Sequence, residues 1–95
     1  MDAVITEIKS KVVPILKAAG IKRSSLFGSY VRGEQRNGSD VDLLVDYPEG
    51  LNLFDVAELK YKLEDVLNKK VDLVGLKTIK PRLKQYILSN QIPLL

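Results

Sequence analysis

Residues 26–46 read LFGSYVRGEQRNGSDVDLLVD, and this stretch decides the fold of the 95-residue chain. An apolar strand that leads into Gly28-Ser29 would end there, and Ser29 could cap one helical turn that Gly33 closes. Residues 36–39 are typical of a turn. Residues 40–46 follow as a second strand, whose almost continuous apolar middle indicates that both of its faces are covered.

The rest of the chain alternates helix and strand signals. Apolar residues that recur every three or four positions predict amphipathic helices, and short apolar runs between turns predict strands. Alternating helices and strands favour one α/β domain over residues 1–95, with helices flanking a small mixed sheet. The predicted helices cover residues 4–19 and 53–67 and begin again near residue 78, and the predicted strands cover residues 21–27, 40–46 and 71–76.

Several details of these elements are specific enough to test. We expect Gly20 to end the first helix and Pro14 to bend or break it. Thr78 is expected to cap the last helix, with Pro81 in its first turn. The apolar tail at residues 92–95 should dock on the domain or mark a contact surface. The residues expected to face inward are Leu53, Val56, Leu59, Leu63, Val66 and Leu67 in the second long helix and Leu83, Tyr86, Ile87 and Leu88 in the last.

The composition narrows the chemistry that is open to the chain. It contains no cysteine and no histidine, which excludes disulfides, thiolate zinc sites and histidine acid–base catalysis. The formal net charge of +3 fits a small anionic substrate such as a nucleotide. No apolar run approaches the roughly 20 residues that span a bilayer. Since Met1-Asp2-Ala3 also lacks the layout of a secretion signal, we expect a cytoplasmic protein.

Asp40 and Asp42 are the first candidate site residues. In a strand they would point to the same face, with Cα atoms roughly 6.5 Å apart. Two carboxylates held in this way repel each other unless a cation lies between them, and Mg²⁺ prefers such oxygen ligands. Taken alone, the pair could be two solvated side chains at a strand edge. The apolar residues that follow argue against that interpretation, because charges beside a buried strand are costly.

Gly28-Ser29 is the second candidate. A strand that ends in this pair at a helix start presents backbone N–H groups and a hydroxyl to an anion, and glycine lets the backbone approach a phosphate closely. Arg32, one helical turn further on, can add a charge-assisted donor on the same side. The alternatives are an ordinary capped turn and a solvated surface arginine.

Asp72 is the third candidate, because it interrupts the apolar strand at residues 71–74. A carboxylate in a core strand needs a partner, and a metal ion shared with Asp40 and Asp42 would supply one. A salt bridge to Lys69 or Lys70, or exposure at the strand start, would explain it equally well. Asp46 is interpreted as a solvated strand end and not as a ligand.

These pieces, in this order, resemble the polymerase-beta-like nucleotidyltransferase superfamily, whose pattern is Gly-Ser, then Asp-x-Asp, then a third carboxylate on a later strand. The three parts lie here at residues 26–34, 39–45 and 71–74. Residues 50–55 and the tail from residue 80 to residue 93 extend the resemblance to the minimal nucleotidyltransferase (MNT) family. That family supplies the antitoxin of many prokaryotic HEPN/MNT toxin–antitoxin pairs.

The resemblance implies a role for each candidate. Two Mg²⁺ ions would be bound by Asp40, Asp42 and Asp72, and Asp72 would also help to orient or deprotonate the acceptor hydroxyl. ATP would be the substrate that donates AMP, and the acceptor would be a tyrosine of the HEPN toxin, so a hetero-oligomer with that toxin is expected. The resemblance places the nucleotide-binding residues at Gly28, Ser29, Arg32 and Ser39.

Size adds one expectation that does not depend on the resemblance. Larger relatives carry a second domain that binds the acceptor, and 95 residues leave no room for one. The acceptor should therefore be held by another chain, and a protein acceptor fits better than a free small molecule.

Two other functions remain open from the sequence. In the first, the chain is an antitoxin that acts by complex formation alone, with a vestigial or nucleotide-sensing site; an exposed apolar tail at residues 92–95 would support it. In the second, the excess of positive charge would let the chain act on or regulate a nucleic acid. With only four Tyr and two Phe, however, the sequence shows no alternation of aromatic and basic residues that is typical of such binding. The residues Lys77, Lys80, Arg82 and Lys84 are interpreted as the solvated face and capping region of the last helix.

Overall fold

The computed structural model describes residues 3–33 and 38–95. The predicted turn at residues 36–39 therefore lies partly outside the described residues. The elements follow in the order α1 (Ala3–Ala18), β1 (Arg23–Phe27), α2 (Ser29–Arg32), β2 (Val41–Asp46), α3 (Leu53–Leu67), β3 (Val71–Gly75), α4 (Pro81–Ser89) and β4 (Ile92–Pro93).

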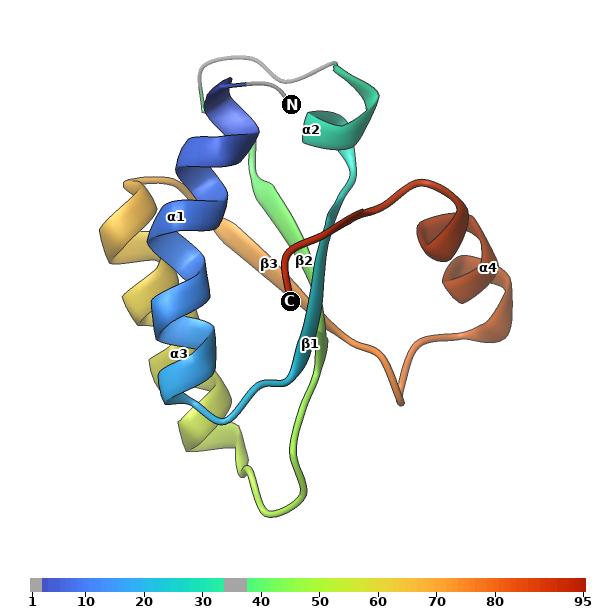
Figure 1. The fold of residues 1–95 in the computed structure, drawn as a ribbon. Helices are drawn as coiled ribbons and strands as arrows, with labels where there is room; N and C mark the ends of the chain where they lie inside the picture. The colour runs from blue at the N-terminus through green and yellow to red at the C-terminus, as the bar shows by residue number, and fades with distance from the viewer. Residues whose placement is uncertain (1–2, 34–37) are drawn as a thin grey trace.

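The strands form one mixed sheet in the order β3-β2-β1-β4. β2 and β3 run parallel, whereas β1 is antiparallel to both of its neighbours. Figure 1 shows α1 and α3 side by side on one face of this sheet and α4 on the other. The predicted small mixed sheet flanked by helices is confirmed.

The core lies between the sheet and the α1–α3 pair. Strand residues that alternate along β2 point into it, and the apolar stripes of both helices meet them. Burial of this stripe explains why the two helices form at all, since an isolated helix of 15 or 16 residues is only marginally stable. The most deeply buried side chains are Val12, Leu16, Leu26, Leu43 and Leu63 together with Val41, Val45 and Ile87.

Pro14, which was predicted to bend or break α1, does not break it. The helix runs without interruption from Ala3 to Ala18, although Pro14 removes one backbone hydrogen bond. Pro14 lies on the exposed side, while Val12 and Leu16 on either side of it are fully buried. Their packing against the sheet holds the helical conformation despite the missing bond.

The first turn of α3 differs from the prediction at Leu53, which is 86% exposed and lies outside the apolar stripe. The helix begins with a capping box that the sequence analysis missed. Asn52 accepts a hydrogen bond from the backbone N–H of Asp55 at 2.9 Å, and Asp55 accepts one from the N–H of Asn52 at 3.0 Å. This cap fixes the helix start before the point at which α3 meets the core.

The last helix also differs from the prediction. Its N-cap is Lys80 and not Thr78, because Pro81 at the first helical position sets the start, and the Thr78 hydroxyl instead donates to the carbonyl of Gly75. Ile87 is the buried residue of α4. The other residues that were expected to face inward, Leu83, Tyr86 and Leu88, are 39–48% exposed. They are exposed because this nine-residue helix meets the domain along only one narrow line.

The apolar tail docks on the sheet and is not an exposed surface. Ile92 and Pro93 pair with Leu26 and Ser25 of β1 as the short strand β4. The N–H of Leu94 donates to the carbonyl of Ser24 at 2.8 Å, and the Leu94 side chain is 4% exposed within the core. The exposed tail that would have supported a purely binding antitoxin is therefore absent from this surface.

Replacing Leu94 by Ala should lower the free energy of unfolding by about 3 kcal/mol, because it leaves a cavity beneath β4. Urea denaturation monitored by circular dichroism would measure the change. Pro93→Ala is the matched control, since Pro93 is exposed and its substitution should cost less than about 1 kcal/mol. Equal and small losses for both variants would contradict a docked tail.

None of the helices in the described residues has the length and apolar character needed to cross a membrane.

Candidate active site

The site begins where β1 ends. Gly28 takes φ 81° and ψ −147°, a conformation that is open to glycine and costly for other residues. Gly28 is also the N-cap of α2, and no side chain caps this helix, so the predicted capping role of Ser29 is wrong. Ser29 is the first helical residue, and Gly33 closes the turn in the left-handed conformation as predicted.

Gly28 lies directly against Asp42. A Cβ atom at position 28 would stand 3.0 Å from Asp42 Cγ and closer still to one carboxylate oxygen. The turn and the carboxylate therefore share one space, and a side chain on residue 28 would compete with Asp42 for it. The sequence predicted a glycine for close approach to a phosphate, but it could not show this approach to an aspartate.

Sheet register aligns three neighbouring strands at the same point. Asp42 pairs with Phe27, the last residue of β1, on one side and with Asp72 of β3 on the other. Directly paired residues point to the same face of a sheet, so Asp42 and Asp72 share the face opposite the α1–α3 core. Asp40 stands just before β2 and is exposed. The structure thus brings the predicted turn and the predicted carboxylates to one corner of the sheet.

The pKa of Asp42 is raised above its ordinary value of 3.8. Partial burial is the main cause, and the negative charges of Asp72 and then Asp40 add to it, while the positive charge of Arg32 acts in the opposite direction. Asp42 is therefore close enough to both Asp72 and Asp40 to be repelled by their charges. This is the electrostatic situation that a bound cation would relieve.

Arg32 connects this corner to α4. Its Nη1 donates a hydrogen bond to the Tyr86 hydroxyl at 3.2 Å. Arg32 is exposed, and its positive charge acts on Asp42, so it lies near this corner of the sheet. The sequence analysis placed Tyr86 in the core and missed this contact, which joins residues 54 positions apart.

Asp72 is exposed at the start of β3. The premise that Asp72 is a buried core carboxylate is therefore wrong, and its exposure alone would account for it; its role as a metal ligand stays a prediction. Two hydrogen bonds hold the start of β3 in place. The N–H of Val71 donates to Glu64 Oε2 of α3 at 2.9 Å. The N–H of Val41, at the start of β2, donates to the carbonyl of Lys70 at 2.9 Å. These bonds fix the register that sets Asp72 beside Asp42.

Tyr30 lies in the core and contacts the backbone of Ser39, which precedes Asp40. The Tyr30 side chain is 3% exposed, and its hydroxyl is 3.5 Å from the carbonyl oxygen of Ser39. This long contact ties α2 to the segment that leads into β2. Ser39 itself is half-buried next to Asp40. Tyr30 was missed by the sequence analysis, and its place within a Gly-Ser-Tyr turn gave no sign that it would be buried.

Asp46 stands apart from this corner. It pairs with Arg23 at the opposite end of β2, and its Oδ1 lies 3.8 Å from the Nζ of Lys77. One of its oxygens is buried, so it is less solvated than predicted. Its distance along the strand confirms that it does not belong with Asp40 and Asp42.

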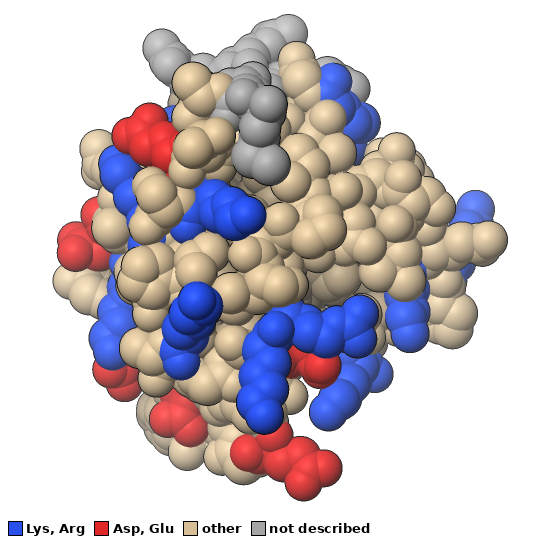
Figure 2. Space-filling view, viewed as in Figure 1, with Lys and Arg blue, Asp and Glu red and all other residues tan. Residues whose placement is uncertain are grey.

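The basic residues do not form a single continuous surface in the view of Figure 2, where they are spread over the face with acidic side chains at its left and lower edges. Lys77, Lys80, Arg82 and Lys84 are all exposed, which confirms their interpretation as a solvated face around α4. This distribution gives no support to a nucleic-acid interface.

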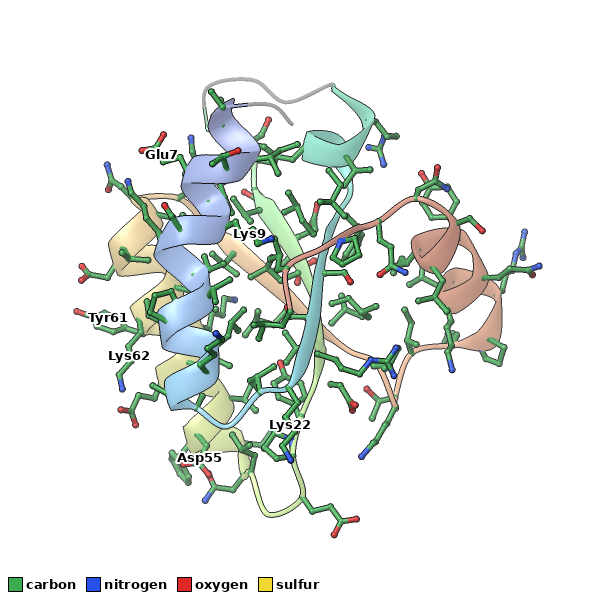
Figure 3. The ribbon with its side chains drawn as sticks, viewed as in Figure 1. Glu7, Lys9, Lys22, Asp55, Tyr61 and Lys62 are labelled. Atoms are coloured by element: carbon green, nitrogen blue, oxygen red, sulfur yellow. The ribbon has the colours of Figure 1, made fainter. Side chains whose placement is uncertain are left out.

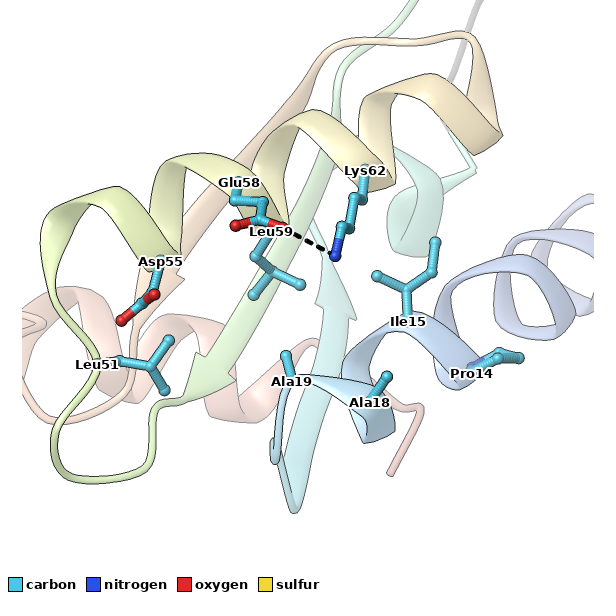
Figure 4. Close-up of a pocket in the computed structure, with 9 residues that line it drawn as sticks. All are labelled: Pro14, Ile15, Ala18, Ala19, Leu51, Asp55, Glu58, Leu59 and Lys62. Carbon is cyan, nitrogen blue, oxygen red and sulfur yellow. Dashed lines mark ion pairs between the residues drawn. The ribbon is translucent and has the colours of Figure 1, made fainter.

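One cavity lies apart from this corner. It occupies about 480 Å³ between α1 and α3, on the opposite face of the sheet from Asp42 (Figure 4). Mostly apolar residues line it, with an ion pair between Lys62 and Glu58 at 3.0 Å among them. It holds none of the predicted site residues.

The sequence of residues 10–95 matches the family model described as polymerase beta, nucleotidyltransferase. The chain belongs to this nucleotidyltransferase family. A relative from Methanocaldococcus jannaschii, "Putative protein adenylyltransferase MJ0435", is 50% identical over 91 residues, which cover 96% of this nucleotidyltransferase and 98% of the relative.

Solved structures agree with this assignment. A "putative minimal nucleotidyltransferase" matches with a TM-score of 0.84 and 39% identity, covering 98% of this nucleotidyltransferase and 96% of that chain. A toxin–antitoxin structure with AMP-PNP matches with a TM-score of 0.81 and 30% identity over 92% and 72% of the two chains. A tri-AMPylated HEPN toxin of Shewanella oneidensis in complex with MNT antitoxin matches with a TM-score of 0.75 and 26% identity over 95% and 71%.

The raised pKa of Asp42 predicts a stability effect. The folded state holds the Asp42 proton more tightly than the unfolded state does, so ionised Asp42 destabilises the fold. This penalty is absent well below pH 3.8, grows as the pH rises, and is complete above the folded pKa. Replacing Asp42 by Asn should therefore raise the free energy of unfolding at pH 7 without divalent cations, by an amount that solvent screening of this partly exposed group keeps small.

Urea denaturation in EDTA between pH 7 and pH 4 would measure this difference. The advantage of Asp42→Asn over the natural protein should shrink as the pH falls. Asp65→Asn, at an exposed position of α3, controls for the substitution itself. A natural protein that is more stable than Asp42→Asn at pH 7 would contradict the repulsion.

Proposed function

We propose that this nucleotidyltransferase is an antitoxin that transfers AMP from ATP to a hydroxyl, a tyrosine in the first instance, of a partner HEPN toxin. It would act in the cytoplasm, where ATP and the toxin are both present. The proposal is supported by the relative named as an adenylyltransferase and by the similarity to antitoxins solved with AMP-PNP or with an AMPylated toxin.

The observation that carries the proposal is the arrangement of Gly28, Asp42 and Asp72. Gly28 directly follows β1 and lies against Asp42 of β2, and Asp42 pairs in register with Asp72 of β3. A phosphate-binding turn is of use to a nucleotidyltransferase only where the α-phosphate can reach carboxylates that organise its transfer. Here the turn at Gly28 contacts the carboxylate of Asp42, and Asp72 lies on the next strand of the sheet.

The residues fit a divalent metal site in their chemistry. Asp40, Asp42 and Asp72 offer oxygen ligands, and their mutual repulsion favours a cation between them. Among residues 3–33 and 38–95, no three acidic side chains are already gathered closely enough to hold an ion, so binding would require them to turn toward a common point. Two Mg²⁺ ions, when bound, would stabilise the charge on the attacking and leaving oxygens.

The chain's own residues supply the other parts of the mechanism. Gly28 and Ser29 would hold the outer phosphates through backbone N–H groups and the Ser29 hydroxyl, and Arg32 would add positive charge beside them. Ser39 would contact the nucleotide from the segment before β2. This binding would orient the α-phosphate toward Asp42 for in-line attack by the acceptor oxygen, which would bond to the α-phosphorus as the bond from that phosphorus to the bridging oxygen breaks and pyrophosphate leaves.

Asp72 is placed to meet an acceptor that belongs to another protein. β3 is one of the two edge strands of the described sheet, and Asp72 is exposed on it. A tyrosine of a docked partner could therefore reach Asp72 without entering a closed pocket. Asp72 would then orient the hydroxyl and accept its proton as the bond to phosphorus forms.

The test is to incubate the purified chain and its toxin with ATP and MgCl₂ and to measure the intact mass of the toxin. We expect the toxin to gain the mass of one or more adenylate groups, and peptide mapping to locate them on tyrosine. EDTA should prevent the gain. An unmodified toxin under conditions in which the two proteins form a complex would refute the proposal.

A second function is favoured by one surface. Leu53 and Phe54 at the start of α3 are large apolar residues that are 86% and 85% exposed. Such residues are typical of a protein-binding surface. Neutralisation by complex formation alone would be supported if a variant without transferase activity still protected cells fully against the toxin.

A further inference from the structure

Tyr86 of α4 is the residue at the site whose role the family pattern does not supply. It lies outside the Gly-Ser turn and the three aspartates, yet its hydroxyl accepts a hydrogen bond from Arg32 Nη1 at 3.2 Å. This bond joins α4 on the second face of the sheet to α2 at the end of β1. Tyr86 therefore reaches the nucleotide site from a different part of the chain.

The turn that carries Tyr86 is attached to the domain next to Tyr86 itself. Ile87, the next residue, is 1% exposed and is the buried residue of α4. Within the last turns of α4, the Ser89 hydroxyl donates to the carbonyl of Gln85 at 2.9 Å, and Asn90 Nδ2 donates to the carbonyl of Tyr86 at 3.1 Å. The chain that follows α4 pairs with β1 as β4, which limits the movement of the C-terminal end of α4.

Arg32 is the last residue of a single-turn helix and is exposed to solvent. Ordering a long, exposed side chain on ligand binding costs entropy. A hydrogen bond to a fixed hydroxyl reduces that cost before the ligand arrives.

We propose that Tyr86 is a positioning residue of the nucleotide site, whose hydroxyl holds the Arg32 guanidinium beside the phosphate-binding turn at Gly28-Ser29. This inference rests on the proposed function, since it requires that a nucleoside triphosphate binds at that turn. Arg32 contacts the outer phosphates, and Tyr86 acts through Arg32 without touching the nucleotide itself.

The test compares Tyr86→Phe, Arg32→Ala and the double variant by calorimetry with two probes, ATP and AMP, both with Mg²⁺. Tyr86→Phe keeps the ring and removes the hydroxyl. We expect it to weaken ATP binding about fivefold and to leave AMP binding unchanged, because AMP lacks the outer phosphates. In the Arg32→Ala background, Tyr86→Phe should have no further effect. In the transfer reaction, KM for ATP should rise with kcat unchanged.

Tyr61→Phe is the matched control. Tyr61 projects from the outer side of α3, away from the sheet, and is 69% exposed (Figure 3). The Tyr61→Phe variant should bind ATP and AMP with the same affinities as the natural protein.

Three results would overturn the inference. The first is unchanged ATP binding by Tyr86→Phe, and the second is an equal loss for AMP, which would point to a ring contact or a general structural effect. The third is an additive effect in the double variant. If the natural protein itself fails to bind ATP, the proposed function falls and this inference falls with it; normal ATP binding with no effect of Tyr86→Phe overturns the inference alone.

Discussion

Replacing Asp42 by Asn should reduce adenylate transfer by about a thousandfold, because losing several kcal/mol of transition-state stabilisation at a metal-binding carboxylate corresponds to that factor. Asp42 is the central group of the site: it contacts Gly28, pairs with Asp72 in register and feels the charges of Asp40 and Arg32. The amide keeps the size of the side chain and removes its charge. Single-turnover transfer to the toxin, followed by mass spectrometry, would measure the rate.

Asp46→Asn is the matched control for this experiment. It makes the same substitution on the same strand and the same face, at the end of β2 that pairs with Arg23. We expect transfer within about twofold of the natural rate, since this position is remote from the site. Because Asp42→Asn should be no less stable than the natural protein, a loss of transfer cannot be attributed to unfolding. Equal rates for the two variants would remove Asp42 from the mechanism.

The parts of the fold that depend on local periodicity were predictable from the sequence. The long helix α3 has the predicted bounds, Leu53–Leu67, and β2 differs from its prediction by one residue at its start. Long apolar repeats identify such elements because burial of one continuous stripe dominates their energy. The mixed sheet followed from the alternation of elements and the resemblance together.

The parts that depend on tertiary contact were not predictable in this way. β4 has two residues, one of them a proline, so it is too short to show the alternating apolar pattern of a strand. It is a strand only because it pairs with β1. In α4, Leu83 and Tyr86 follow a helical apolar pattern but remain exposed, because the sheet offers that helix only a narrow contact. A pattern shows which residues could be buried together, and only the neighbouring element decides which of them are.

The candidate site shows the same division. The residue types and their order identified Gly28, Asp40, Asp42 and Asp72, since phosphate and metal binding need these groups near one another. Burial was misjudged at Asp72, because an apolar run does not reveal that its strand lies at the edge of the sheet. The Arg32–Tyr86 bond was missed because 54 residues separate its partners.

Replacing Gly28 by Ala should reduce adenylate transfer by about a hundredfold and lower the free energy of unfolding by about 3 kcal/mol. Two causes act together. The backbone at φ 81° and ψ −147° is strained for any residue with a Cβ, and the new methyl group would lie 3.3 Å from Asp42 Cβ and nearer to its carboxylate. Asp42 can escape the contact by rotating about χ1, but this rotation carries its carboxylate away from the position that the site needs.

Gly33→Ala separates general strain from this specific contact. Gly33 also has a positive φ, 71°, but nothing lies within 4 Å of a Cβ built there. Its substitution should cost about 1 kcal/mol from backbone strain, with transfer close to the natural rate. Urea denaturation and single-turnover transfer, measured on both variants, would test the contrast.

The contact itself can be isolated by combining Gly28→Ala with Asp42→Ala, which removes the carboxylate. If the methyl group and the carboxylate compete for one space, Gly28→Ala should destabilise the Asp42→Ala background less than it destabilises the natural protein, by about 1 kcal/mol. The remaining cost would come from the backbone strain and from the contact with the Cβ atom of residue 42, which alanine retains. Equal costs in the two backgrounds would show that residue 28 and Asp42 do not compete, and that the glycine is required for its backbone conformation and not for the placement of the carboxylate.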